Sequence, residues 1–286
     1  EAYDFQAGHL SYTITNDTLS PYTVEVASNW QIHYGDTIIV PESVVNNDIT
    51  YIVTGIGQGA FLDEDIVAIT LPNSIRYIDD CAFTECYALK NINIPESLEY
   101  IGISAFADCI SLEIPLALPN TLTRLGDAAF FNAGITHITI PESVTSIGYD
   151  AFSECGSLIS VTISKNVTSI GSYAFENCYK LIEVINKSNL YISTGSSSNG
   201  YIAYYAKTVH SGTTKIVNQN GYLFYPLSNG TNYLLGYTGI DTVLTLPENY
   251  NGQSYQIYKY AFYGCSSLKE VHITNIASWC NIDFSS

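Results

Sequence analysis

Apolar and polar positions alternate along this chain in a unit that recurs about every 23 residues. The unit is clearest from Ile138 to Ile163, where the sequence reads ITIPESVTSIGYDAFSECGSLISVTI. It holds a short alternating run, a proline, a V-x-x-I-G step, an Ala-Phe pair and a cysteine three residues after the phenylalanine. Alternation predicts a short strand, with Val161 and Ile163 facing a core and Ser160 and Thr162 facing outward.

The phenylalanine of the unit marks its period. The first six of the seven Ala-Phe pairs lie 22 to 24 residues apart, with phenylalanine at Phe61, Phe83, Phe106, Phe130, Phe152, Phe175 and Phe262. A fixed period in this range predicts a solenoid. One coil buries too little apolar surface to offset the ordering of its own residues, so only the stacked array is expected to fold.

Glycine follows the V-x-x-I step in most copies, at Gly57, Gly102, Gly126, Gly148 and Gly171. We expect these glycines to supply the positive φ that a sharp turn requires.

Cysteine recurs three residues after the phenylalanine, at Cys86, Cys109, Cys155, Cys178 and Cys265. This position predicts a column of small, buried, reduced side chains. A metal site is disfavoured because no C-x-x-C pair occurs and ligands one coil apart do not form a tetrahedral set. Cys81 and Cys280 lie outside the column and are expected to be more exposed.

The pattern divides the chain into four segments. Residues 1–55 lack the repeat and predict a β-rich cap and a first strand, with strands at 10–15, 22–27 and 30–34 and a turn at 46–48. Residues 56–185 are the regular repeats. Residues 186–242 interrupt them with a polar loop at 189–200 and a tyrosine-rich β-hairpin around Asn229-Gly230. Residues 243–286 resume the repeat and stop without a closing cap, which suggests that the natural chain continues.

The phrase IPESVTSIGYDAFSECGSL resembles the BspA-like leucine-rich repeat family of bacterial surface proteins. The resemblance covers residues 56–185 and resumes at about 243–274. It implies a right-handed leucine-rich-repeat solenoid of the α/β horseshoe class, with short strands and little helix. It also implies a secreted or surface-displayed protein that adheres to host matrix proteins or to other bacteria, and no catalytic residues.

Composition restricts the partners. The formal net charge is −17, with only ten Lys and Arg. Nucleic acids and anionic membranes are therefore disfavoured, because binding them requires clustered basic residues. No apolar run is long enough to predict a transmembrane helix. The sequence contains no methionine, which we interpret as a processed chain whose signal peptide has been removed.

Candidate catalytic motifs are weak. The string from Gly55 to Ala60 matches a dinucleotide-binding fingerprint, but no long helical pattern follows it. The acidic residues at 63–65 and 79–80 lack the spacing of a calcium loop and are interpreted as solvated. No metalloprotease, hydrolase or phosphate-loop motif occurs. We therefore expect no enzyme activity, no metal and no cofactor.

Two surfaces are candidates for binding. The first is the concave face of the solenoid, where outward strand positions place Thr70, Asn91, Asn93, His137, Thr139, Ser160, Thr162 and Glu183. The second is the hairpin insert with Tyr222, Tyr225, Tyr233 and Tyr237, because tyrosine is enriched at binding hot spots. The leading hypothesis is a protein partner, such as a host matrix protein. A glycan-binding module that uses the insert and a structural spacer within a larger surface protein are the alternatives.

Overall fold

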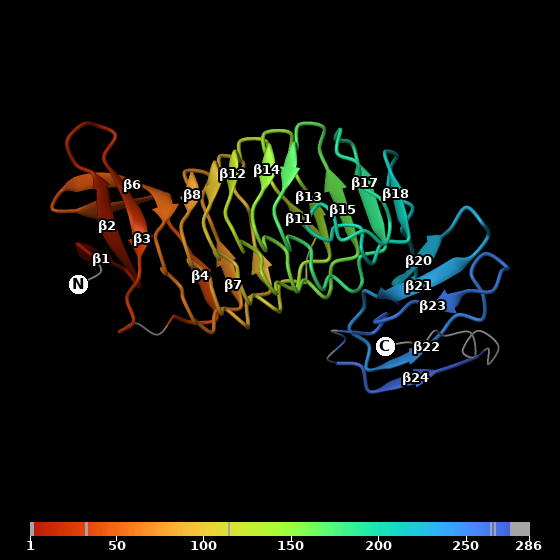
Figure 1. The fold of residues 1–286 in the computed structure, drawn as a ribbon. Helices are drawn as coiled ribbons and strands as arrows, with labels where there is room; N and C mark the ends of the chain where they lie inside the picture. The colour runs from red at the N-terminus through yellow and green to blue at the C-terminus, as the bar shows by residue number, and fades with distance from the viewer. Residues whose placement is uncertain (1–2, 32–33, 114, 264, 266, 275–286) are drawn as a thin grey trace. The chain divides into compact units, whose positions relative to one another are not determined.

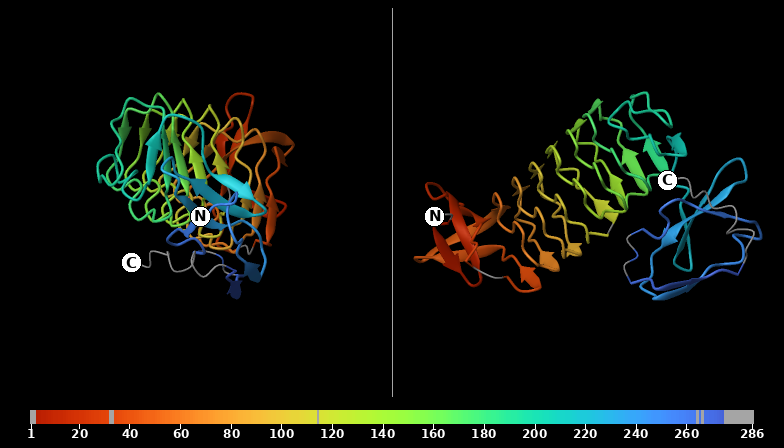
Figure 2. Two further views of the ribbon diagram at one scale, coloured as in Figure 1. Left: turned by 90° about the vertical axis from the view of Figure 1, so that its right-hand side faces the viewer. Right: turned by 60° about the horizontal axis from the view of Figure 1, so that its bottom comes forward.

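The computed structural model describes residues 3–31, 34–113, 115–263, 265 and 267–274 (Figure 1). The described residues form short strands and turns, and no helix occurs among them. They divide into two units, Glu1–Ser211 and Gly212–Ser286. The predicted solenoid is confirmed in the first unit, where strands of successive coils stack in parallel (Figure 2).

The cap is a set of antiparallel strands joined to the first coil. Strands β1 (Phe5–Ala7), β2 (Leu10–Asn16) and β3 (Thr23–Ala27) pair antiparallel, and β3 pairs in parallel with β6 (Ile49–Ile56). β5 (Ser43–Asn46) forms a hairpin with β6 through Asn47 and Asp48, both of which have positive φ. Such a two-residue turn suits the twist of the strands it joins.

The prediction of a strand at 30–34 is wrong for the described residues, because Trp30, Gln31 and Tyr34 lie outside any strand. The Asn29 side chain accepts a hydrogen bond from the backbone N–H of Gln31 at 3.1 Å. This local turn competes with strand pairing. The Trp30 side chain is accordingly 83% exposed. Residues 32 and 33 lie outside the described residues.

The coils from β7 to β16 each contribute two strands rather than the single one that the sequence predicts. The alternating run forms one face: β4 (Thr37–Ile39), β7 (Ala68–Thr70) and β9 (Asn91–Ile92) in one sheet, then β11 (Pro115–Ala117), β13 (His137–Thr139), β15 (Ser160–Ile163), β17 (Glu183–Asn186) and β18 (Thr208–His210) in another. The V-x-x-I step forms a second ladder: β8 (Tyr77–Ile78), β10 (Tyr100–Ile101) and β12 (Arg124–Leu125) continue from β6, and β14 (Ser146–Ile147) pairs with β16 (Ser169–Ile170).

The repeated phenylalanines form a continuous stack in the core of the first unit. From Phe61 to Phe175, successive ring centroids lie 5.3, 5.2, 5.1, 5.5 and 5.1 Å apart, and all six side chains are 0% exposed. The backbone N–H of each of the first five donates to the alanine carbonyl of the next coil at 2.8 Å. Side-chain packing and backbone bonds therefore hold the same coils together.

The buried cysteines do more than fill space. The thiol of Cys86 donates to the carbonyl oxygen of Phe61 at 2.9 Å, and Cys109, Cys155 and Cys178 repeat this bond to the phenylalanine of the preceding coil. Burial raises the pKa of Cys86 and of Cys155 to about 12. The thiols thus stay neutral, as donors within the core require.

The prediction that the repeated glycines supply a positive φ is wrong. None of the five has a positive φ. A Cβ on Gly102 would instead lie 2.5 Å from the backbone of Asp79, and one on Gly126 would lie 2.5 Å from the backbone of Gly102. Close approach of neighbouring coils therefore excludes a side chain here. The positive φ values fall beside the Ala-Phe pair, as at Asp150 and Glu154.

The solenoid extends further than the repeat pattern indicates. β18 pairs in parallel with β17, and Ile202 and Ala203 belong to the same core as the phenylalanine stack. The backbone N–H of Phe175 donates to the carbonyl of Gly200 at 2.7 Å, which continues the bonds of the earlier coils. The polar loop expected at 189–200 is thus part of an additional coil, which has no phenylalanine at the repeat position.

The second unit contains the predicted hairpin. β19 (Val217–Gln219), β20 (Tyr222–Pro226) and β21 (Asn232–Tyr237) pair antiparallel, and β23 (Gln256–Ile257) joins β21 in parallel. The resumed repeat supplies β22 (Val243–Thr245) and β24 (Glu270–His272), which pair in parallel. A separate cluster of buried side chains, including Phe224, Leu234 and Tyr255, forms its core.

Candidate binding surfaces

The first predicted surface is the outward face of the strands from β4 to β18. Strand register aligns the expected columns, since His137 pairs with Ser160 and Ser160 with Glu183. Thr70, Asn91, Asn93 and Thr139 are exposed, and His137 and Thr162 are half-buried. Asn93 bonds through its side-chain amide to the backbone N–H and C=O of Leu71, at 2.7 and 2.8 Å. The Asn93 side chain therefore continues the hydrogen bonding between β7 and β9 beyond the ends of the two strands.

Two residues predicted on this face do not point into solvent. Ser160 is 6% exposed and Glu183 is 0% exposed. Ser160 is small and lies in register between His137 and Glu183, and a carboxylate oxygen of Glu183 lies 2.9 Å from Nε2 of His210. Burial is also the main cause that lowers the pKa of His137. The accessible part of the face is thus smaller and closer to the cap than expected.

The second predicted surface, the hairpin insert, uses its tyrosines mainly for packing. Tyr225 is 0% exposed and lies in register with Tyr233 on β21, an inner strand of the sheet, so its prediction as a surface residue is wrong. Tyr222 is half-buried and donates to the carbonyl of Thr245 at 2.7 Å. Tyr237 bonds to Asp241, and its ring centroid lies 4.9 Å from that of Tyr222.

A third surface was not anticipated from the sequence. Six tyrosines on the later coils of the first unit make an unbroken chain of ring contacts, with centroids 4.9 to 6.0 Å apart: Tyr149, Tyr173, Tyr201, Tyr204, Tyr205 and Tyr179. We call this set the tyrosine cluster. Tyr149, Tyr173 and Tyr204 are 50%, 41% and 45% exposed. A usable signal existed, since tyrosines recur about one coil apart, at 149 and 173 and again at 179 and 205.

Two carboxylates, Asp150 and Glu176, lie near tyrosines of the cluster. The charge of Asp150 is the main cause that raises the pKa of Tyr149, and Glu176 adds to it. Burial raises the pKa of Tyr205 to about 12, again with a contribution from Glu176. Exposed aromatic rings beside carboxylates favour a basic ligand, because cations are attracted both to ring faces and to negative charge.

The described residues do not bring together three or more His, Cys, Asp or Glu side chains in a way that would hold a metal ion. Gly55 to Ala60 lie at the end of β6 and in the turn after it, and no helix follows among residues 57–113. Within the described parts of both units, no helix has the length and apolar character needed to cross a membrane.

Comparison with known proteins agrees with this architecture. A leucine-rich repeat protein of T. pallidum is 26% identical, with a TM-score of 0.57, and the match covers 65% of this chain and 83% of that one. A leucine-rich repeat protein of Bacteroides ovatus is 23% identical, with a TM-score of 0.50 over 95% of this chain and 76% of that one. A leucine rich cell surface protein of Faecalibacterium prausnitzii is 21% identical, with a TM-score of 0.52 over 96% and 78%.

No curated protein sequence matches the chain. The sequence profile of the BspA type leucine rich repeat region matches residues 54–182, 114–219 and 242–285. These ranges cover more than half of the 286 residues and include both the stacked coils and the resumed repeat. The chain therefore belongs to the BspA-type leucine-rich repeat family.

Proposed function

We propose that this chain is a non-catalytic binding protein of the bacterial surface, and that it attaches to a basic region of a partner protein through the tyrosine cluster. The observation that carries the proposal is the unbroken set of ring contacts among tyrosines, three of which are more than 40% exposed. Tyrosine presents a large contact area at a low cost in conformational entropy, which favours binding.

Charge supports a basic protein partner over a neutral glycan. The chain has a net charge of −17, and Asp150 and Glu176 lie close enough to the cluster to raise the pKa of Tyr149. Lys or Arg side chains of a partner would gain from both rings and carboxylates. A neutral sugar would use only the rings. Host matrix proteins with basic segments remain the leading candidates, in line with the adhesion that the family resemblance implies.

The test is a binding screen with matched variants. Immobilised fibronectin, fibrinogen and laminin are compared with a glycan array as targets for the chain. The double variant Tyr149→Ser, Tyr204→Ser should bind its matrix protein at least tenfold more weakly. Tyr191→Ser is the control, because Tyr191 is 86% exposed but lies outside the cluster, and it should change binding less than twofold.

The outcomes separate the alternatives. Matrix binding that weakens as salt rises supports the proposal, because surface charge interactions are screened. Binding to glycans alone would favour a carbohydrate-binding module instead. Failure to bind either class of target would favour a structural spacer.

A further inference from the structure

The edge of strand β4 is open on one side. β4 is the first strand of the sheet β4-β7-β9, and among the described strands it pairs only with β7. Asp36 accepts a hydrogen bond from Ala68, and Val40 donates one to Thr70, both at 3.0 Å. Since backbone groups alternate in direction along a strand, the N–H and C=O groups of Thr37 and Ile39 point away from β7.

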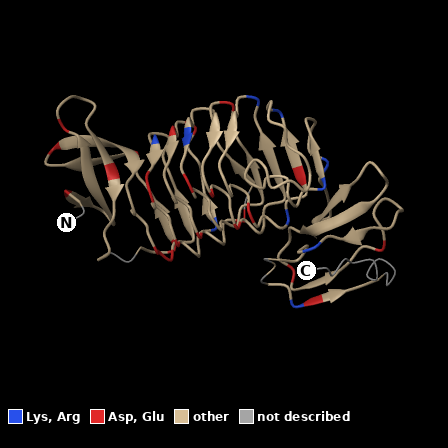
Figure 3. Cartoon of the chain, in the orientation of Figure 1, with Lys and Arg blue, Asp and Glu red and all other residues tan. Residues whose placement is uncertain are grey.

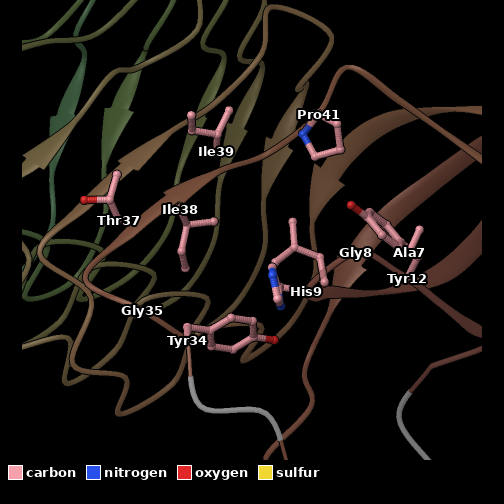
Figure 4. Close-up of a pocket in the computed structure, with 11 residues that line it drawn as sticks. Ala7, Gly8, His9, Tyr12, Tyr34, Gly35, Thr37, Ile38, Ile39 and Pro41 are labelled. Carbon is pink, nitrogen blue, oxygen red and sulfur yellow. The ribbon is translucent and has the colours of Figure 1, made fainter.

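A hollow of about 580 Å³ lies beside this edge. Figure 4 shows residues of β4 on one side of it and residues from the β1–β2 turn on the other. Leu10, Ile38 and Pro41 give the lining an apolar character. Ile39, on the open edge, is 73% exposed. Natural sheets usually protect such an edge, because unpaired backbone groups are a template for another strand.

Two hydroxyl groups in the lining of the hollow have no hydrogen-bond partner among the residues that the structure describes. They belong to Tyr12 and Tyr34, and both oxygen atoms are buried. The whole Tyr12 side chain is 0% exposed. Burial raises the pKa of Tyr34 to about 12, so this hydroxyl is neutral and able to donate. A buried polar group without a partner is costly, which points to a ligand that completes it.

The cap and first coil, which form the hollow, are acidic in sequence. The first Lys or Arg of the chain is Arg76, and the preceding segment contains ten acidic residues: Glu1, Asp4, Asp17, Glu25, Asp36, Glu42, Asp48, Asp63, Glu64 and Asp65. Figure 3 shows this contrast over the cap and first coil. A basic segment is favoured here, whereas a second copy of the chain would bring the same negative charge to the interface.

We propose that the open edge of β4 is a strand-addition site for a basic, extended segment of a partner protein. The segment pairs with the backbone of Thr37 and Ile39, as in other cases of binding at a sheet edge. One of its side chains enters the hollow, where an aromatic ring contacts Leu10 and Ile38. A polar tip on that ring bonds to the hydroxyls of Tyr12 and Tyr34. A tyrosine side chain meets these requirements.

This site is separate from the tyrosine cluster, because it is formed by the cap and first coil whereas the cluster lies on the later coils. Neither proposal depends on the other. The variants that test the cluster therefore leave this site unchanged, and they serve as controls for it.

The test uses three fluorescent peptides of sequence Lys-Thr-Val-X-Val-Thr-Lys, in which X is Tyr, Leu or Ala. Fluorescence anisotropy with the full chain should give the tightest binding for X = Tyr and at least tenfold weaker binding for X = Ala. Hydrogen exchange should show that the amides of Thr37 and Ile39 exchange freely in the isolated chain and become protected when the peptide binds.

Two substitutions probe the edge and the hollow separately. Ile39→Pro removes only an outward N–H, a change that an edge strand tolerates, and it should abolish peptide binding while leaving the fold intact. Ile39→Val is its control and should bind normally. Tyr34→Phe removes one hydroxyl and should weaken the X = Tyr peptide several-fold while leaving the X = Leu peptide unchanged.

Three results would overturn the proposal. One is the absence of binding by all three peptides at millimolar concentration. Another is binding that Ile39→Pro does not affect. The third is evidence that the edge is already covered by the chain itself or by a second copy. Such evidence would be protection of the Thr37 and Ile39 amides in the isolated chain, or self-association that is lost in Ile39→Pro.

Discussion

The two units of this protein use the same repeat phrases but bury them to different extents. In the first unit, Phe152 is 0% exposed and lies between Phe130 and Phe175, at 5.5 and 5.1 Å. In the second unit, the corresponding Phe262 is only half-buried. The centre of that core is occupied by Phe224, whose ring lies 4.5 Å from Tyr250 and 5.3 Å from Tyr255.

The difference shows that a repeat phrase does not create a core by itself. The same Ala-Phe pair becomes part of a stack only where coils lie on both sides of it. Where the neighbouring strands come from an antiparallel hairpin, the hairpin supplies the buried aromatic residues instead. Stability in the first unit should therefore depend on stacking, and in the second on the hairpin.

The largest expected effect comes from the phenylalanine stack. Phe152→Ala should reduce the free energy of unfolding of the first unit by about 3–5 kcal/mol, because it opens a cavity between two rings. Phe262→Ala should reduce that of the second unit by about 1–2 kcal/mol, since a half-buried ring loses less apolar contact. Hydrogen exchange monitored by mass spectrometry reports each unit separately. Equal losses at both sites would remove the distinction between the units.

Alkaline pH should affect the first unit next most strongly. Burial raises the pKa of Cys86 and Cys155 from 9.0 to about 12, so these thiols stay neutral in the folded chain after the unfolded chain has begun to ionise. Their contribution to stability is present below pH 9 and is lost as the pH rises towards 12. At pH 10 the loss should be about 1.4 kcal/mol for each thiol.

Urea unfolding at pH 8 and pH 10 measures this loss. The free energy of unfolding should fall between pH 8 and pH 10, and Cys155→Ala should make this fall smaller by the contribution of one thiol. A difference that is unchanged in the variant would show that the buried thiols are not responsible. Cys265, in the second unit, is only half-buried and provides the natural comparison; Cys280 lies outside the described residues.

Two glycines distinguish close packing from backbone conformation. Gly126→Ala should lower the free energy of unfolding by about 1–3 kcal/mol, because the added Cβ meets the backbone of Gly102. Gly252 in the second unit has φ +76° and no atom within 4 Å of an added Cβ. Asparagine tolerates this conformation, so Gly252→Asn should cost only a few tenths of a kcal/mol. Gly126→Asn should cost at least as much as Gly126→Ala; a mild effect there would contradict close packing as the reason for the glycine.

The smallest effect is expected on the outward face of the first unit. Thr162→Ala should change the free energy of unfolding by no more than about 0.5 kcal/mol, because Thr162 is half-buried and points away from the core. The same measurement as for Phe152→Ala provides the comparison. A loss of several kcal/mol at Thr162 would mean that the inward and outward positions of β15 had been interchanged.

The sequence predicts the parts of the fold that depend on local periodicity. Alternation correctly separates inward Val161 from outward Thr162, and the phenylalanine period predicts the stack. Contacts between distant residues are not visible in that pattern. The burial of Glu183 depends on strand β18 and His210, which follow an irregular coil without the Ala-Phe pair. The reason for Gly126 depends on the distance between coils, which a single repeat does not reveal.

The candidate sites show the same limit. Tyrosine count suggested the hairpin insert, but Tyr225 is fully buried while Tyr149 and Tyr173 are exposed on the turns of the coils. The open edge of β4 could not be predicted, because it arises where the antiparallel cap pairs with β6 and leaves the other sheet unextended.

The backbone bonds between the phenylalanine N–H and the alanine carbonyl of the next coil have a mechanical consequence. They join one coil to the next, so a force that pulls the ends of the solenoid apart acts equally on every junction. The weakest junction yields first, and the others then hold until the force rises again. Each released coil of about 23 residues would lengthen the chain by about 75 Å. Under tension the first unit would therefore extend in steps, absorbing work at each one while the remaining coils stay folded.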